Sequence, residues 1–364
     1  MNNTKKLTFN SVLKKATTCC GKYSYAFVFG LILIVYAITI NASGNQFNPG
    51  HISAILSSQN SVVVGTMAIG MALVIITGQI DLSLGSSLVL CSGITIMTYN
   101  ATDGNVFLMF LAALGSGLVC GLINGVLVGY AKMPSFIVTL GTMLIYRSLT
   151  LSAVREIDST LSGSSSSLFA MIDDMPSYEF IRLKFGTGGL RLGTFQIPYI
   201  FFLFIAVTVL FIFVMSYTKY GKSVYAVGSN EKAARLAGIN VSGVKVSVFV
   251  IAGLMVGIAS FIQACKIGSV TPASSGTSYE MYAIAAVVLG GVNMAGGRGK
   301  ILGVFFGALS YTAINFIIVS IPSLSPDIQN TFQGLVLIVV ILIQTLSPIV
   351  KEKITLYRKR KTQK

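Results

Sequence analysis

Long apolar segments alternate with short polar stretches along most of the chain. Ten of them are apolar enough to cross a bilayer as helices, which takes about 17–25 residues each. The third and the eighth are short and interrupted by glycine, which is typical of broken or re-entrant helices. We therefore predict an all-α integral membrane protein with about ten transmembrane helices. The expected spans are 23–41, 58–77, 83–99, 105–130, 135–153, 197–216, 244–264, 279–293, 299–320 and 328–347.

Two stretches of the chain share a weak internal similarity. Residues 72–88 read ALVIITGQIDLSLGSSL, and residues 286–302 read AVVLGGVNMAGGRGKIL. Each is an apolar run, a break containing glycine, a short polar stretch and a Gly-rich entry into the next apolar run. Duplicated halves with broken helices at matching positions are typical of transporters. We therefore predict two weakly repeated halves, with chance similarity between Gly-rich spans as the alternative.

Composition agrees with a membrane protein. Hydrophobic residues make up 54% of the chain and charged residues 10%, and the mean hydropathy is +0.80. A soluble domain carries about 25% charged residues, so this chain could not cover a water-facing surface. The net charge is +15. We expect no nucleic-acid partner, because the basic residues are confined to loops and tails as a membrane topology requires.

The basic residues also predict the orientation. They gather in a tail over 1–22, at Lys132, between Lys219 and Lys245, at Arg298 and Lys300, and in a tail over 348–364. The positive-inside rule places these parts and both termini in the cytoplasm. The transmembrane domain is then 23–347, with a cytoplasmic loop over 217–243. We expect a multi-pass protein of the bacterial cytoplasmic (inner) membrane.

The segment 154–196 is then extracytoplasmic. It has a serine run at 162–167 and is too long for a tight connection. It is either a flexible insertion or a lid or docking surface on the outer face.

The cytoplasmic loop contains a short helix reading NEKAARLAGI. Ser229 or Asn230 can cap its first turn, and Glu231 suits the positive end of its dipole. Gly238 ends it. The helix is either a docking surface for another protein or a solvated connector.

Residues for enzyme chemistry are missing. The chain has one histidine, His51, and five cysteines without metal-ligand spacing. It has no phosphate-loop motif and no Ser/His/Asp set. We expect no catalytic residues, no metal and no cofactor.

A few polar residues lie within the apolar runs. Asp81 or Ser83 can cap the helix beginning near Leu84, or Asp81 can act as a gate in a transport pathway. Glu280, at the start of the eighth span, has the same two interpretations. Arg147 is expected to extend toward the outer interface or to pair with an acid such as Asp158.

Several amides could line a pathway for a neutral, hydroxyl-rich solute, because amides donate and accept hydrogen bonds without adding charge. The alternative for each is an interhelical hydrogen bond. These residues are Asn60, Gln79, Asn124, Asn293 and Asn315.

Four stretches carry a resemblance to a known family. TGQIDLSLGSSL resembles the GGIDLSVGS stretch of ribose-type ABC importer permeases, and GLINGVLVGYAKMPSFIVTLGTM resembles their next signature. GKSVYAVGSNEKAARLAGINV resembles their cytoplasmic loop, and the block from GSVTPASSGTSYEMYAIAAVV to GGRGKILGVFFGAL resembles their C-terminal part. The match runs in order over roughly 50–345, within the branched-chain/ribose permease superfamily.

The resemblance implies the permease subunit of a monosaccharide importer. Two copies would form the pathway, two cytoplasmic ATPase subunits would drive alternating access, and an extracytoplasmic solute-binding protein would deliver a ribose- or galactose-like sugar. Nucleosides or other furanosyl solutes are alternative substrates. A proton-coupled transporter using Asp81, Glu280 and Arg147 is a further alternative.

In this family the NEKAARLAGI stretch matches the helix that couples the permease to the ATPase. Glu231, Ala234 and Arg235 are expected to touch the ATPase. The full set of coupling residues is Asn230, Glu231, Ala233, Ala234, Arg235, Leu236, Gly238 and Ile239.

The chain departs from the family in two places: Tyr282 replaces a common acidic residue, and 154–196 is longer than expected. Both leave the sugar open. The predicted pathway or gate residues are Gln79, Asp81, Ser83, Asn124, Glu280, Tyr282, Asn293 and Asn315.

Overall fold

A computed structural model describes residues 24–164 and 167–321, together with residues 328, 331, 332, 334, 335, 338, 339 and 342. Both predicted basic tails and most of the tenth predicted span lie outside the described residues. The helices of the first half are α2 (Ser24–Ala42), α3 (Pro49–Ser57), the π-helix η1 (Asn60–Val64), α4 (Gly65–Ile76), α5 (Leu84–Ala101), α6 (Val106–Gly129), α7 (Ser135–Glu156) and α8 (Ser159–Ser162).

The remaining helices are α9 (Tyr178–Ile181), the π-helix η2 (Arg182–Gly186), α10 (Tyr199–Tyr217), α11 (Lys219–Ser229), α12 (Glu231–Leu236), α13 (Val241–Ile267), α14 (Tyr279–Leu289) and α15 (Ile301–Val319). Four short strands accompany them: β1 (Phe169–Ala170), β2 (Gly189–Leu192), β3 (Phe195–Pro198) and β4 (Ser269–Val270).

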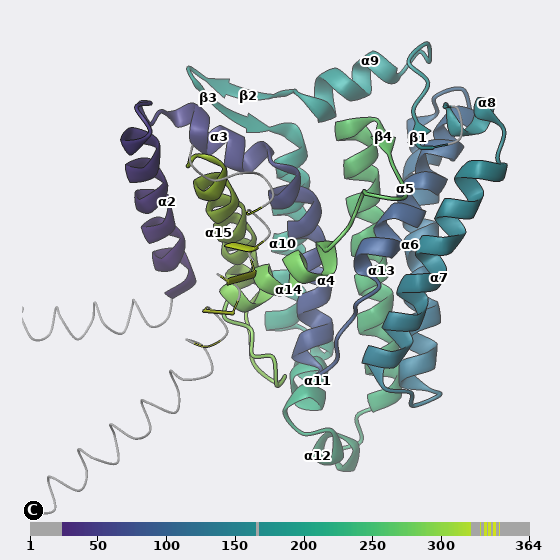
Figure 1. Cartoon of the computed structure of the whole chain (residues 1–364). Coiled ribbons are helices and arrows are strands. Elements are labelled where there is room, and N and C mark those ends of the chain that lie inside the picture. Colours follow the sequence, from purple (N-terminus) through teal and green to yellow (C-terminus); the bar gives the residue numbers. More distant parts are fainter. Residues whose placement is uncertain are drawn as a thin grey trace, which may run out of the picture.

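The long helices form a bundle with two different ends (Figure 1). We call the end that carries α11 and α12 the α12 end, and the end that carries α8, α9 and the strands the α9 end. Every residue of α4 is buried, so this helix lies in the core. In contrast, α2, α6, α7 and α10 expose many large apolar side chains. Such faces suit contact with lipid chains.

The predicted ten spans are not confirmed. Among the described residues, six helices are long and apolar enough to cross a membrane: α2, α6, α7, α10, α13 and α15. A seventh results if α3 and the η1–α4 segment, bent by 53°, count as one span. With 11 residues, α14 is too short, because a span needs about 20 residues. The 18 residues of α5 include several Ser, Thr and Asn side chains, which lower its apolarity.

Glycines bring the backbones of α6 and α13 into close contact. Glycines at four-residue spacing on α6 meet Gly253 and Gly257 of α13. A Cβ on Gly121 would overlap the Phe249 carbonyl oxygen, and one on Gly117 would overlap that of Gly253. Backbones this close leave no room for side chains, so α6 and α13 pack as one unit.

The predicted extracytoplasmic segment 154–196 is folded onto the bundle. Its strand β1 pairs antiparallel with β4, which follows α13, in the register Phe169 to Val270. The side chain of Asn100, at the end of α5, donates to the Leu161 and Ala170 carbonyls at 2.9 Å. The strands β2 and β3 form a hairpin. The backbone amide of Gln196 in β3 donates to the Ser53 hydroxyl of α3 at 2.7 Å.

The two similar stretches, 72–88 and 286–302, each contain a helix end, a break and a new helix. Gly78 and Gly291 have positive φ values of 76° and 79°, which glycine adopts without strain. The two breaks touch, because the Gly297 amide donates to the Ile76 carbonyl at 2.8 Å. The repetition of whole halves stays a prediction.

Candidate functional site

Asp81 lies in the break between α4 and α5 and is 3% exposed. Its Oδ1 accepts hydrogen bonds from the Ser83 amide at 2.9 Å and from the Ser83 hydroxyl at 2.6 Å. The side-chain amide of Asn124 donates to the same hydroxyl at 2.8 Å, and the Thr142 hydroxyl donates to Asn124 Oδ1 at 2.8 Å. This chain of contacts joins the start of α5 to α6 and α7, and we call it the Asp81 network.

Ser83 occupies the N-cap position of α5, and the Asp81 carboxylate lies two residues before it, bonded to the Ser83 backbone amide. The hydroxyl of Ser83 makes no cap bond of its own. The backbone amide of Ser83 has no partner within the helix, and it donates instead to the Asp81 carboxylate. The negative charge also lies at the positive end of the α5 dipole. Both effects stabilise a helix that begins inside the bundle.

Thr142 was missed in the sequence, although a signal was present. One buried face of α7 carries polar side chains at helical spacing: Ser135, Thr139, Thr142, Tyr146 and Thr150. Ser135 also accepts a hydrogen bond from the Ile80 amide at 3.3 Å, next to Asp81. A polar face on an otherwise apolar helix marks contact with other polar groups.

Glu280 is close to the start of α5, because a Cβ on Gly85 would overlap its carboxylate. The helices α5 and α14 thus begin near each other part-way along the bundle (Figure 1). Both N-terminal ends face a region that also contains Arg147. Helix ends that meet inside a membrane protein are typical of solute sites in transporters.

The predicted pairing of Arg147 with Asp158 is wrong, and its extension toward the outer interface stays a prediction. Its guanidinium donates to the Pro272 and Ser275 carbonyls, both at 2.7 Å, and is partly buried. Asp158 instead caps α8, where it accepts from the Thr160 amide. The backbone turn before α14 offers Arg147 two acceptors closer than any acid at the helix end. Arg147 thereby ties α7 to the start of α14.

The other predicted pathway residues are spread over the bundle. Tyr282 packs between Tyr279 and Tyr311 in tilted ring pairs, with centroids 5.8 and 5.3 Å apart. Asn315 is buried on α15, and its Oδ1 accepts no hydrogen bond from a described residue. Asn293 lies exposed in the loop after α14, where it accepts from the Ala295 amide. The structure brings Asn124, but not Asn293 or Asn315, into the Asp81 network.

The predicted polar loop over 217–243 contains two helices. The sequence missed α11, which buries Gly221, Val224 and Val227. Tyr220 lies 2.9 Å from the Ser247 hydroxyl, and Tyr225 donates to the Gly299 carbonyl at 2.8 Å. Burial raises the pKa of both phenols, which favours the protonated form. The helix α11 is thus fixed to the bundle on two sides.

The short helix α12 is capped by Asn230 and ended by Gly238, as predicted. Asn230 Oδ1 accepts from the Ala233 amide at 3.0 Å. The helix ends at Leu236, and Gly238 adopts a φ of 81°. Ile239 therefore lies beyond the helix, because the left-handed glycine turns the chain toward α13.

The expected contact residues of α12 face different ways. Ala234 is 4% exposed, so its side chain is not free to touch a partner. Glu231 pairs with Lys245 of α13 at 2.9 Å and with Arg235 at 3.4 Å. Leu236 is 90% exposed and is the most exposed apolar side chain of this helix. The outward surface of α12 is thus formed by Leu236 with Lys232 and Arg235.

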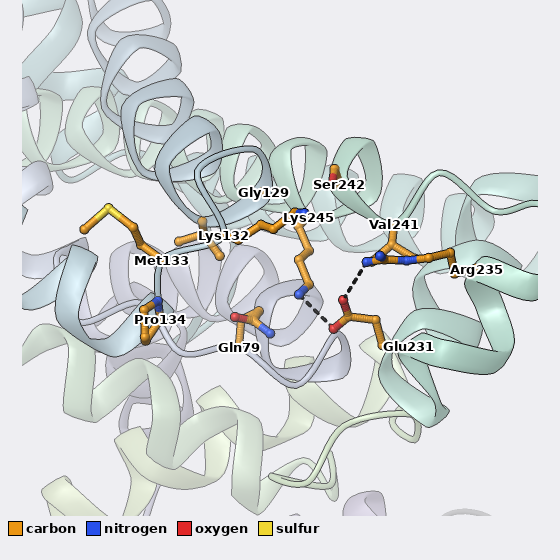
Figure 2. A pocket seen from close by; sticks show the side chains of 11 residues that line it. Gln79, Gly129, Lys132, Met133, Pro134, Glu231, Arg235, Val241, Ser242 and Lys245 are labelled. Carbon is orange, nitrogen blue, oxygen red and sulfur yellow. Dashed lines mark hydrogen bonds and ion pairs between the residues drawn. The ribbon is translucent and has the colours of Figure 1, made fainter.

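A polar cleft of about 270 Å³ lies beside α12. It is bounded by the break before Asp81, the turn between α6 and α7, α12, and the start of α13. Figure 2 shows Glu231 between Lys245 and Arg235. The lining residues are Gln79, Val128, Gly129, Lys132, Met133, Pro134, Glu231, Arg235, Val241, Ser242 and Lys245.

Comparison with known proteins decides the family. The profile of the family described as "Branched-chain amino acid transport system / permease component" matches residues 53–341. The chain belongs to this permease family. The permease is 35% identical to the ribose import permease protein of Escherichia coli (strain K12) over 284 residues, covering 78% of this chain and 82% of that protein.

Two further relatives cover more of the permease. The ribose import permease protein of Bacillus subtilis (strain 168) is 33% identical over 348 residues, 93% of this chain and 95% of that protein. The galactose/methyl galactoside import permease protein of Haemophilus influenzae is 31% identical over 334 residues, covering 88% of this chain and 93% of that protein. No solved structure matches the permease.

Membership of this family makes the permease a multi-pass transport component and not itself an enzyme. Within the described ranges, no group of three His, Cys, Asp or Glu side chains could hold a metal ion.

Proposed function

We propose that the permease is the membrane subunit of an ABC importer that moves a monosaccharide into the cytoplasm. The observation that carries this proposal is its similarity, along most of its length, to import permeases named for ribose and galactose. A fructose import permease of Rhizobium meliloti is similar too, at 34% identity over 279 residues. We infer a ribose- or galactose-like sugar as the solute.

The α12 end is proposed to face the cytoplasm and to dock the ATPase subunits. Support comes from the exposed surface of α12 and from the basic residues near it. Movement of α12 would be transmitted to α13 through the Glu231–Lys245 ion pair. It would then reach α6 through the glycine contacts, and Asn124 of α6 belongs to the Asp81 network. Alternating access would follow from movement of this unit against α5 and α7.

The remaining partners follow from the same proposal. Two copies of the permease would enclose the pathway, and a solute-binding protein would dock at the α9 end. The folded segment that includes the β2–β3 hairpin offers a surface there. Buried amides and hydroxyls in the Asp81 network suit a neutral solute, since they bind hydroxyl groups without a charge.

The test replaces the exposed leucine of α12. Leu236→Glu should weaken docking of the ATPase, because a charge would then occupy the apolar centre of the contact. We expect loss of ATPase co-purification and at least a tenfold drop in ATP-driven sugar uptake in proteoliposomes. The matched control is Leu192→Glu, a leucine 61% exposed on β2 at the α9 end, which should leave ATPase co-purification unchanged.

Retained docking and uptake in Leu236→Glu would overturn the role of α12. Uptake driven by a pH gradient with no ATPase present would overturn the proposed importer class. The sugar is tested separately, by thermal shift of the partner binding protein over a sugar panel. A ligand that is not a monosaccharide would contradict the proposed substrate.

A further inference from the structure

The cleft beside α12 has an excess of positive charge. Three basic side chains line it, Lys132, Arg235 and Lys245, against one acid, Glu231. Glu231 is shared by Arg235 and Lys245 through its two oxygens. A single carboxylate does not balance three cations, so an anion would be attracted to the cleft.

Three polar side chains at the cleft are unused. Within the described part of the chain, Lys132, Gln79 and Ser242 make no side-chain hydrogen bond or ion pair. They come from the turn between α6 and α7, the break after α4, and the start of α13. Together they offer an ammonium group, an amide and a hydroxyl around one space.

The backbone of Lys132 is held in an unusual conformation. Its φ is 56°, in the left-handed region that a lysine seldom adopts. The cost of such a conformation is about 1 kcal/mol or more, and strained residues often occur at ligand sites. The turn between α6 and α7 therefore fixes the backbone of Lys132, whose side chain lines the cleft.

We propose that this cleft binds a phosphate ester that carries hydroxyl groups. The phosphate would bind Lys132 and Arg235, and the hydroxyl groups would bind Gln79, Ser242 and Glu231. The volume of about 270 Å³ is close to the lower end of ordinary small-molecule sites, about 300–1,000 Å³. This size fits a sugar phosphate or the head group of phosphatidylglycerol, which share this chemistry.

Occupancy of the cleft would bridge α12, α13 and the α6–α7 turn. The ligand would add contacts between elements that the Glu231–Lys245 pair joins on one side only. It would thus hold α12 in one position relative to the bundle and stabilise the folded permease.

The test uses the full-length permease in phosphatidylcholine nanodiscs and measures its thermal unfolding midpoint. One arm adds a pentose phosphate, with the free pentose as control, and the other replaces part of the lipid with phosphatidylglycerol. At least one arm should raise the midpoint. A response to the soluble ester assigns the cleft to a metabolite, and a response to the lipid alone assigns it to a head group.

Variants separate the cleft from general surface charge. Lys132→Asp should raise the apparent Kd of the active probe at least tenfold, because a charge-assisted contact becomes a repulsion. Ser242→Leu should weaken binding by filling the cleft without changing its charge. The control Lys222→Asp makes the same charge change at an exposed residue of α11 that does not line the cleft, and it should leave the Kd unchanged.

No response to either probe would overturn the proposal. Equal losses in Lys132→Asp and Lys222→Asp would also overturn it, because the attraction would then come from the whole surface. The experiment measures binding to the cleft and not transport. Its result therefore does not depend on whether the permease carries a monosaccharide.

Discussion

At the scale of single residues, Asp81 distinguishes a structural role from a transport role. Its carboxylate accepts from the amide and the hydroxyl of Ser83 and reaches Asn124 through that hydroxyl. An asparagine in its place keeps a side-chain oxygen that can accept the same two bonds. An alanine keeps neither.

We expect Asp81→Asn to retain sugar uptake and to lose only the dipole contribution, about 0.3–1 kcal/mol of folding free energy. Asp81→Ala should lose more, about 1–2 kcal/mol, because it also removes the hydrogen bonds to Ser83. Uptake in proteoliposomes and thermal unfolding of the purified permease measure the two effects. If Asp81→Asn folds normally but no longer transports sugar, the negative charge takes part in transport.

Single residues also show where sequence reasoning stopped. The position of Asp81 at a helix start followed from its place in a Gly-containing break. The burial of Ala234 did not, because contacts with neighbouring elements decide which side of a six-residue helix is buried. Arg147 bonds to two carbonyls of a turn more than 120 residues later, and no local pattern predicts that partner.

At the scale of elements, the α6–α13 contact is sensitive to a single methyl group. Gly121 faces the Phe249 carbonyl and the Val250 Cα, whereas Gly115 on the same helix has no atom within 4 Å of an added Cβ. The two glycines therefore form a matched pair on α6.

Gly121→Ala should lower stability by about 1–3 kcal/mol, because the helices must move apart to make room. Gly115→Ala should instead raise stability by about 0.5–1 kcal/mol, because alanine favours a helix interior over glycine and nothing obstructs its methyl group. Unfolding of both variants in a denaturing detergent, beside the wild type, measures the difference. Equal effects would show that α6 and α13 are not in close contact.

The elements were predicted unevenly. Long apolar helices such as α6, α10 and α13 lie close to their expected bounds, because length and apolarity suffice to define them. The helix α14 was expected to span and has 11 residues, since Gly290 and Gly291 end it early. The sequence analysis missed α11, whose buried positions are few and include a glycine.

At the scale of the whole molecule, the orientation can be measured directly. Leu192 and Leu236 are both exposed, at opposite ends of the bundle (Figure 1). In a background with Cys19 and Cys20 replaced by serine, the other three cysteines are buried. Leu192→Cys should then react with a membrane-impermeant maleimide added outside cells, and Leu236→Cys only in inverted vesicles. The reverse pattern would place the α12 end outside.

The contact between the Gly297 amide and the Ile76 carbonyl has a consequence for motion. It joins the break after α4 to the break after α14, so the two breaks cannot open independently. Gly228 of α11 packs against the same carbonyl and the same amide. Three segments distant in the chain thus meet at one point. Movement of any one of them would therefore also move the other two.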